Sequence, residues 1–140
     1  MKIVTAITGV AAACAIGSSL IGPATADPAG TCVFNFADGR PYPQHGAVIV
    51  GGEVDCPVKP DMLHTDLQIM FRVNGRWAGR NAANSSQPPN PRLNLATYAQ
   101  CEPGAWIGMA DLWEDTAGRS THMRFTSTTV IISAEECRHK

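Results

Sequence analysis

Apolar and polar residues alternate along much of the chain after residue 30, and a period of two predicts β-strands. The clearest stretch is DLQIMFRV (66–73), in which every second residue is apolar. Further strands are expected at 31–36, 46–56, 76–80, 93–101, 105–115 and 121–133. No stretch has the spacing of an amphipathic helix, so we expect an all-β protein.

Turn residues separate these stretches, most clearly Asn74-Gly75, which is a strong hairpin signal. About seven short strands joined by turns predict an antiparallel, immunoglobulin-like β-sandwich, with a small barrel as the alternative. Gly51-Gly52 interrupts one strand and predicts a bulge.

The polar, proline-rich stretch 81–92 is expected to be a loop inside one domain. As a linker it would leave two pieces of roughly 50 residues, each with too little core to fold alone. Residues 134–140 are expected to form a polar tail. The single β-sandwich domain is thus expected to span 27–140.

The first 26 residues have the three parts of a secretory signal peptide. Lys2 precedes an apolar run that continues to Ile21, and Ala24-Thr25-Ala26 provides the small residues of a cleavage site. Cleavage after Ala26 makes the protein a secreted one, with no membrane span in the mature chain. The alternative is a lipoprotein signal with lipidated Cys14, but the apolar run continues beyond that cysteine.

Charge narrows the choice of partners. Without Lys2, 10 basic and 12 acidic residues remain, and the arginines are scattered along the chain. A nearly neutral domain without a cationic stripe does not fit nucleic acid or a charged membrane surface. The partner is therefore expected to be an extracellular protein or glycan.

The four cysteines after the signal predict two disulfides, as is usual in a small exported domain. Their wide spacing does not fit a zinc site, which would use close pairs. Hairpin register favours Cys32–Cys56 and Cys101–Cys137, whereas an inter-sheet Cys56–Cys101 bridge is the rival.

No catalytic, cofactor or metal motif stands out, so an enzyme is not expected. His64 and Asp66 would share a strand face as a conceivable acid–base pair, yet no nucleophile motif accompanies them. DLWED (111–115) has three carboxylates that calcium would accept. Its spacing differs from that of a calcium loop, so a solvated turn is expected.

The tryptophans are candidates both for the buried core and for an exposed binding surface. Trp106 and Trp113 are seven residues apart in one strand, so they should face opposite sides. We expect Trp113 to be exposed, where it could bind sugar or peptide. Trp77 is predicted to be buried opposite Phe71, across a bulged three-residue loop formed by residues 73–75, because burial outweighs turn preference.

The cysteine layout and the segments PVKPDMLHTDLQIMFRV (57–73) and TYAQCEPGAW (97–106) provide a resemblance. The chain resembles small secreted four-cysteine β-sandwich proteins of actinobacteria over most of its mature length. The resemblance implies export and a β-sandwich, and no particular chemistry. This chain departs from them in having Arg138-His139-Lys140 after the last cysteine.

DCPVKPD (55–61) is similar to the reactive loop of the streptomycete subtilisin-inhibitor family, in which Cys-Pro precedes the bond presented to the protease. The resemblance would make Val58 the residue that enters the protease pocket, followed by Lys59. The order of the cysteines differs, however, and a turn bounded by prolines also explains the segment. A secreted, non-enzymatic binding protein is the expected function, with peptidase inhibition through Cys56-Pro57-Val58-Lys59 as the alternative.

Overall fold

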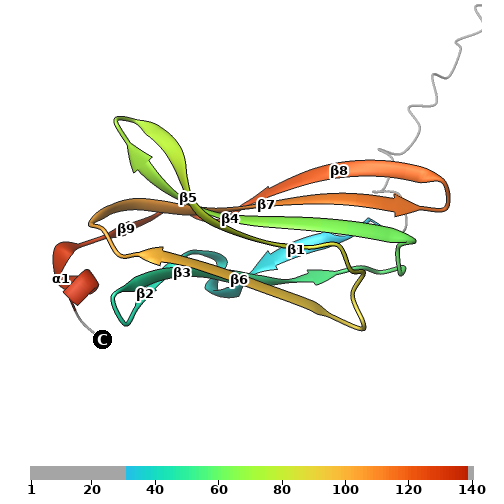
Figure 1. The fold of residues 1–140 in the computed structure, drawn as a ribbon, viewed down its shortest axis with the longest axis horizontal. Coiled ribbons are helices and arrows are strands. Elements are labelled where there is room, and N and C mark those ends of the chain that lie inside the picture. Colours follow the sequence, from blue (N-terminus) through green and yellow to red (C-terminus); the bar gives the residue numbers. More distant parts are fainter. Residues whose placement is uncertain (1–30, 139–140) are drawn as a thin grey trace, which may run out of the picture.

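The computed structural model describes residues 31–138, which form two antiparallel sheets that face each other (Figure 1). The strands are β1 (Val33–Phe36), β2 (Tyr42–Gln44), β3 (Ala47–Asp55), β4 (Met62–Val73), β5 (Arg76–Ser85), β6 (Leu93–Gln100), β7 (Gly104–Thr116), β8 (Arg119–Thr126) and β9 (Val130–Ile132). A 3₁₀ turn, η1 (Ala37–Gly39), follows β1, and a short helix, α1 (Ala134–Arg138), ends the described chain. The expected all-β, antiparallel fold is confirmed. The expected signal peptide, its cleavage site and Cys14 lie outside the described residues.

Each sheet is organised around one long strand. In the first, here called the β3 sheet, β6 lies along one side of β3, and β1 and β2 share the other side. In the second, called the β4–β7 sheet, the order is β5-β4-β7, and β8 and β9 share the far side of β7. The described residues contain two strands more than expected, β2 and β9. Each has only three residues, which is too short for alternation to reveal it.

Alternation along the strands decides which side chains fill the core. On β4 the inward residues include Leu63, Thr65, Leu67 and Ile69, whereas the alternate residues face outward. Val48, Val50 and Val54 of β3 meet them from the opposite sheet. Each fully buried side chain of this size contributes roughly 1.5–3 kcal/mol relative to exposure.

Two glycines make room for core side chains, and one of them, Gly108, lets the two sheets approach closely. A Cβ atom on Gly108 would lie 2.5 Å from Val50 Cγ2 and 2.9 Å from Phe36 Cε1. A Cβ atom on Gly52 would lie 2.6 Å from Phe34 Cε1. The two phenylalanine rings pack edge to face, with centroids 4.8 Å apart, in the space that the glycines leave.

The two disulfides are Cys32–Cys56 and Cys101–Cys137, the pairings that hairpin register favours. The first joins neighbouring strands of the β3 sheet, and the second ties α1 to the end of β6. They close loops with sequence separations of 24 and 36 residues. In the chain-entropy account, loops of this length stabilise the folded state by about 3–4 kcal/mol each.

The expected bulge at Gly51-Gly52 is absent, because β3 keeps an unbroken register with both β1 and β6 in this region. Phe36 pairs with Gly52 and Val33 with Asp55, so the same register continues to Cys32 and Cys56 without an inserted residue. The glycines are needed for packing instead. Gly52 leaves room for Phe34 inside, and Gly51 leaves a hollow outside.

The loop expected at 81–92 is shorter, because β5 continues to Ser85 and pairs with β4 from Ile69 to Thr65. Small and polar residues form this edge strand, so alternation of apolar residues could not reveal it. The strand expected at 121–133 is divided into β8 and β9. At the break, the Ser127 hydroxyl accepts a hydrogen bond from the backbone of Gly108 (2.7 Å), and Thr128 N donates to Gly39 O (2.9 Å).

The expected polar tail contains α1, whose start is fixed by a capping box. Ser133 N donates to Glu136 Oε2 (2.7 Å), and Glu136 N donates to Ser133 Oγ (3.1 Å). Hydrogen bonds from the Ser133 backbone and side chain lower the pKa of Glu136. The turn of helix brings Cys137 back to Cys101.

The prediction for Trp77 is wrong. Val73 pairs with Arg76 and Arg72 with Trp77, so the loop has two residues, Asn74 and Gly75, both with positive φ. Trp77 is partly exposed on the outer side, and the Arg72 guanidinium lies 5.8 Å from the centre of its ring. The hairpin tip bends away from the β3 sheet (Figure 1), so no core is available there to bury an indole.

Removing either of two buried hydroxyl groups should change the free energy of unfolding, in opposite directions. The Thr65 hydroxyl is buried without a hydrogen-bond partner in the described chain. Thr65→Val should therefore raise the free energy of unfolding by about 1 kcal/mol. Ser127→Ala removes the hydroxyl that accepts a hydrogen bond from Gly108 N. This substitution should lower the free energy of unfolding by about 1–3 kcal/mol. Urea unfolding of both variants tests this, and a loss of stability in Thr65→Val would contradict the assignment.

Candidate functional site

The outer side of the β4–β7 sheet has a row of three aromatic side chains from three neighbouring strands. Strand pairing places His64 of β4 beside Trp113 of β7, and Trp113 beside His122 of β8. The Trp113 and His122 rings are stacked, 4.8 Å between centroids and 9° between planes. The His64 ring is tilted on the other side, at 5.4 Å. The indole thus has an imidazole neighbour from each of the two flanking strands.

Trp113 is exposed as expected, with 42% of its surface accessible, whereas Trp106 is fully buried. Their odd spacing in one strand puts them on opposite sides of the sheet. The Trp106 indole N–H donates to the carbonyl of Glu102 (2.9 Å). No described residue accepts a hydrogen bond from the Trp113 indole N–H, which leaves it available to a ligand.

Asp111 lies next to this row and holds the side chains of His122 and Arg124 in place. One oxygen, Oδ1, is 2.8 Å from His122 Nε2 and 2.9 Å from Arg124 Nε, and Arg124 Nη2 donates to Oδ2 at 3.2 Å. The Asp111 side chain is only 4% exposed although it belongs to the outer side of the sheet. Burial raises the pKa of Asp111, but hydrogen bonds and charge from Arg124 and His122 outweigh it, so the pKa is lowered overall.

The three acids of DLWED do not form a solvated turn, which corrects the expectation for them. All three lie within β7, and successive residues of the strand face opposite sides. Glu114 is buried on the inner side, where it accepts hydrogen bonds from Cys32 N (2.8 Å) and Thr116 Oγ1 (2.7 Å). The first of these bonds joins the two sheets. In the described range 31–138, no group of three or more histidine, cysteine or acidic side chains is placed to hold a metal ion.

His64 and Asp66 share the outer side of β4, but each has a different partner. His64 Nδ1 lies 2.9 Å from Ser86 Oγ, whereas Asp66 Oδ2 accepts a hydrogen bond from Gln68 (3.2 Å). A hydrolytic triad needs one imidazole between a hydroxyl and a carboxylate. Here the hydroxyl contacts His64 and the carboxylate contacts His122, with Trp113 between the two rings.

A hollow of about 370 Å³ lies beside the aromatic row. Its lining includes Met62, His64, Ser86, Trp113, Ser120 and His122. Met62 is 66% exposed, an unusual degree for a long apolar side chain. The hollow therefore combines apolar surface with hydroxyl and imidazole groups.

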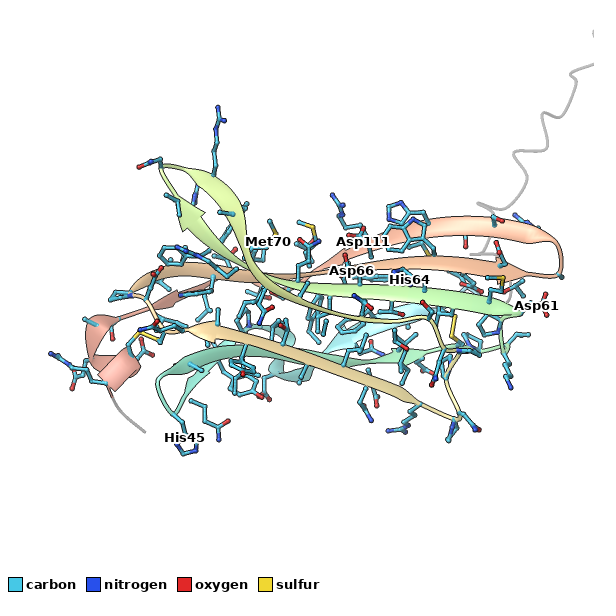
Figure 2. The ribbon with its side chains drawn as sticks, viewed as in Figure 1. His45, Asp61, His64, Asp66, Met70 and Asp111 are labelled. Carbon is cyan, nitrogen blue, oxygen red and sulfur yellow. A yellow bond between two sulfur atoms is a disulfide. The ribbon has the colours of Figure 1, made fainter. Side chains whose placement is uncertain are left out.

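The same side of the sheet continues beyond the row toward the β4–β5 hairpin. Figure 2 shows His64, Asp66, Asp111 and Met70 along it. Strand register adds Met109, Ile107, Arg72 and Trp77. We call this surface, from Met62 to Trp77, the aromatic face. It has three of the five methionines and two of the three tryptophans of the chain.

Val58 and Lys59 are exposed in the corner where the chain passes from β3 to β4, and neither lines the hollow beside the aromatic row. This corner is held at both sides. Cys56 is disulfide-bonded, Pro60 is buried, and Asp61 N donates to the carbonyl of Asp115 (2.8 Å). The segment thus connects the two sheets while presenting two side chains to solvent.

Sequence reasoning missed His122 and Arg124 as partners of Asp111. These contacts depend on the register of the β7–β8 hairpin, in which a two-residue turn at Ala117-Gly118 pairs Thr116 with Arg119. That register puts His122 opposite Trp113 and Arg124 opposite Asp111. A two-residue turn with Gly at its second position was the signal that could have found them.

Comparisons with protein-family models, with curated proteins and with solved structures gave no match. Across the described residues, none of the helices has the length and apolar character needed to cross a membrane.

The ion contacts of Asp111 predict a pH-dependent stability. Its pKa lies below the ordinary 3.8 in the folded chain, so the folded state binds fewer protons than the unfolded state near that pH. The contribution is complete above pH 3.8 and is lost as the pH falls through the lowered pKa. Asp111→Asn should lower the free energy of unfolding by roughly 1–3 kcal/mol at pH 7.

Urea unfolding at a series of pH values tests this, with exposed Asp55→Asn as the matched control. The difference in unfolding free energy between wild type and Asp111→Asn should become smaller at acid pH. A difference that is constant with pH, or that is equally large for the Asp55 variant, contradicts the role given to Asp111.

Proposed function

We propose that this chain is a secreted, disulfide-stabilised, non-enzymatic protein that binds an extracellular protein partner through the aromatic face. The observation that carries the proposal is the kind of side chain gathered there. Methionine, tryptophan and arginine are enriched in protein interfaces. On the aromatic face, Met62, Trp113 and Arg124 are all exposed.

The electrostatics of the face also support a protein partner. Asp111 is covered and held by Arg124 and His122, so its charge is largely compensated. Trp113 forms the apolar part of the face beside the hollow, and Asp66, Asp111 and Arg124 lie along one side of it. Binding hot spots combine such an aromatic anchor with a polar surround.

The stacked row supports binding because its side chains already have neighbours that restrict them. His122 is held by Asp111 and by the Trp113 ring, and His64 by Ser86. Ordering free side chains on association costs about 0.5–1.5 kcal/mol each. A face ordered before binding avoids part of that cost.

Export rests on the expected signal peptide and on the two disulfides, which are typical of proteins from oxidising compartments. Two disulfides in a small domain suit a protein that must stay folded outside the cell. A non-enzymatic role is favoured because the hydroxyl and the carboxylate of the aromatic face contact different histidines.

Loss of Trp113 should remove most of the binding. The mature protein, immobilised, is exposed to the secreted fraction of the producing cells, and a retained protein is identified by mass spectrometry and purified. Trp113→Ala should weaken its affinity by about 2 kcal/mol or more, roughly 30-fold, measured by calorimetry. Tyr98→Ala, an exposed aromatic residue of the β3 sheet, is the matched control and should bind as wild type. Equal losses in both variants contradict the proposal.

Peptidase inhibition is the second candidate, because Val58 is 49% exposed in a corner held by Cys56 and Pro60. A segment presented to a protease needs such exposure and anchoring. Against it, the corner also connects the two sheets, which explains its rigidity.

Val58→Asp and Lys59→Ala should leave partner binding unchanged if the corner is only a connection. Titration of wild type against subtilisin and trypsin should show no inhibition. Stoichiometric inhibition that either substitution abolishes, in a variant with unchanged unfolding, would establish the inhibitor function instead.

A further inference from the structure

The outer side of the β3 sheet has a hollow of about 460 Å³, which is within the size range of small-molecule sites, roughly 300–1,000 Å³. Its floor is formed by Gly51 of β3 and Ala96 of β6, which pair across the sheet. A Cβ atom on Gly51 would lie 3.3 Å from Ala96 Cβ. The floor is thus open because these two neighbours have almost no side chain.

One wall of the hollow is a row of polar side chains from three strands. Asn35 of β1 pairs with Glu53 of β3, and Glu53 pairs with Asn94 of β6. All three line the hollow. Neither carboxamide has a hydrogen-bond partner among residues 31–138, so both can donate to and accept from a ligand.

On the other side of the floor lies an apolar and aromatic row. Ile49 of β3 is flanked by Tyr42 of β2 and Tyr98 of β6. Tyr98 is 64% exposed. None of these three residues lines the hollow, so only a ligand that extends beyond the floor along β6 would meet the Tyr98 ring.

The charge of this site is balanced. Glu53 Oε2 lies 3.3 Å from Arg92 Nη1, and no other ion pair of the described residues involves the hollow. A strongly charged ligand would therefore find no uncompensated opposite charge. Neutral groups that both donate and accept hydrogen bonds fit the two carboxamides and the carboxylate.

We infer that this hollow binds a neutral saccharide. A hydroxyl is both donor and acceptor, as the carboxamides require, and neighbouring hydroxyls on a sugar ring match several side chains in a row. The apolar side of a sugar ring presents C–H groups, which suit the apolar part of the lining at Ala37, Leu95 and Ala96. A peptide strand would instead use the backbone groups of a sheet edge, whereas this hollow lies on the face of a sheet.

The site differs in place and chemistry from the aromatic face, which lies on the opposite sheet. Its test is therefore independent of the partner proposed above. The saccharide site would give the protein a second contact, so that a protein and a glycan could be held on its two sides.

The test is an NMR titration of ¹⁵N-labelled mature protein with four neutral tetrasaccharides, cellotetraose, maltotetraose, chitotetraose and xylotetraose. A tetrasaccharide of galacturonate is the charged comparison. At least one neutral compound should shift the amide signals of Gly51, Ala96 and the Asn35 and Asn94 side chains. The galacturonate compound should not.

Ala96→Leu fills the floor of the hollow and should weaken that binding at least tenfold. Ala82→Leu, the same substitution at an exposed position of the opposite sheet, is the matched control and should have no effect. Asn94→Ala provides a second variant in case Ala96→Leu does not fold, and should weaken binding at least fivefold. The inference is overturned if no neutral tetrasaccharide shifts these signals, if only the galacturonate compound does, or if Ala82→Leu weakens binding as much as Ala96→Leu.

Discussion

The close contact between the sheets at Gly108 is the constraint on which the rest of this structure depends. Any larger residue at Gly108 would collide with Val50 and Phe36 of the opposite sheet, whereas Gly52 leaves room for Phe34 of its own sheet. The contact at Gly108 fixes how near β7 comes to β1 and β3. Packing of such density leaves little freedom to shift one sheet against the other.

Both outer surfaces follow from that contact. Because the inner positions of β4 and β7 are set, the alternate residues must face solvent, and His64, Trp113 and His122 come together without any loop to place them. The Gly51-Gly52 pair has one residue on each side of the β3 sheet. Gly52 serves the core and Gly51 opens the outer hollow, so two adjacent glycines have two different roles.

Asp111 shows how a buried charge is tolerated on the outer side of a sheet. Its carboxylate loses water, but two neighbouring side chains of β8 supply the hydrogen bonds that replace it. A buried carboxylate left without partners would be costly, so the three residues form one unit. The unit holds His122 parallel to Trp113, which connects the electrostatics of the sheet to the shape of the proposed binding surface.

The sequence was sufficient for features that depend on alternation and spacing. The all-β class, the two disulfides and the exposure of Trp113 all follow from which residues are apolar and how far apart the cysteines lie. Features that depend on the exact register were missed. The contacts of Asp111 depend on the register of the β7–β8 hairpin, and an expected core at the β4–β5 tip placed Trp77 inside.

Other misses had a local cause. The capping box of Ser133 and Glu136 is legible in the sequence, but a five-residue helix has no apolar stripe to announce it. The end of β5 has small polar residues, and the buried position of Glu114 depends on Cys32 in the opposite sheet. Contacts between distant segments cannot be inferred from a pattern within one segment.

Cross-linking in place tests the central claim, that the aromatic face is where the partner binds, most directly. The photoreactive residue p-benzoylphenylalanine replaces Met62, at the edge of the aromatic row, in the protein produced by its own cells. The control places it at Gln100, exposed on the β3 sheet. After illumination, the account predicts a discrete cross-linked protein from position 62 and none from position 100. Cross-linking from position 100 alone, or equally from both, would contradict it.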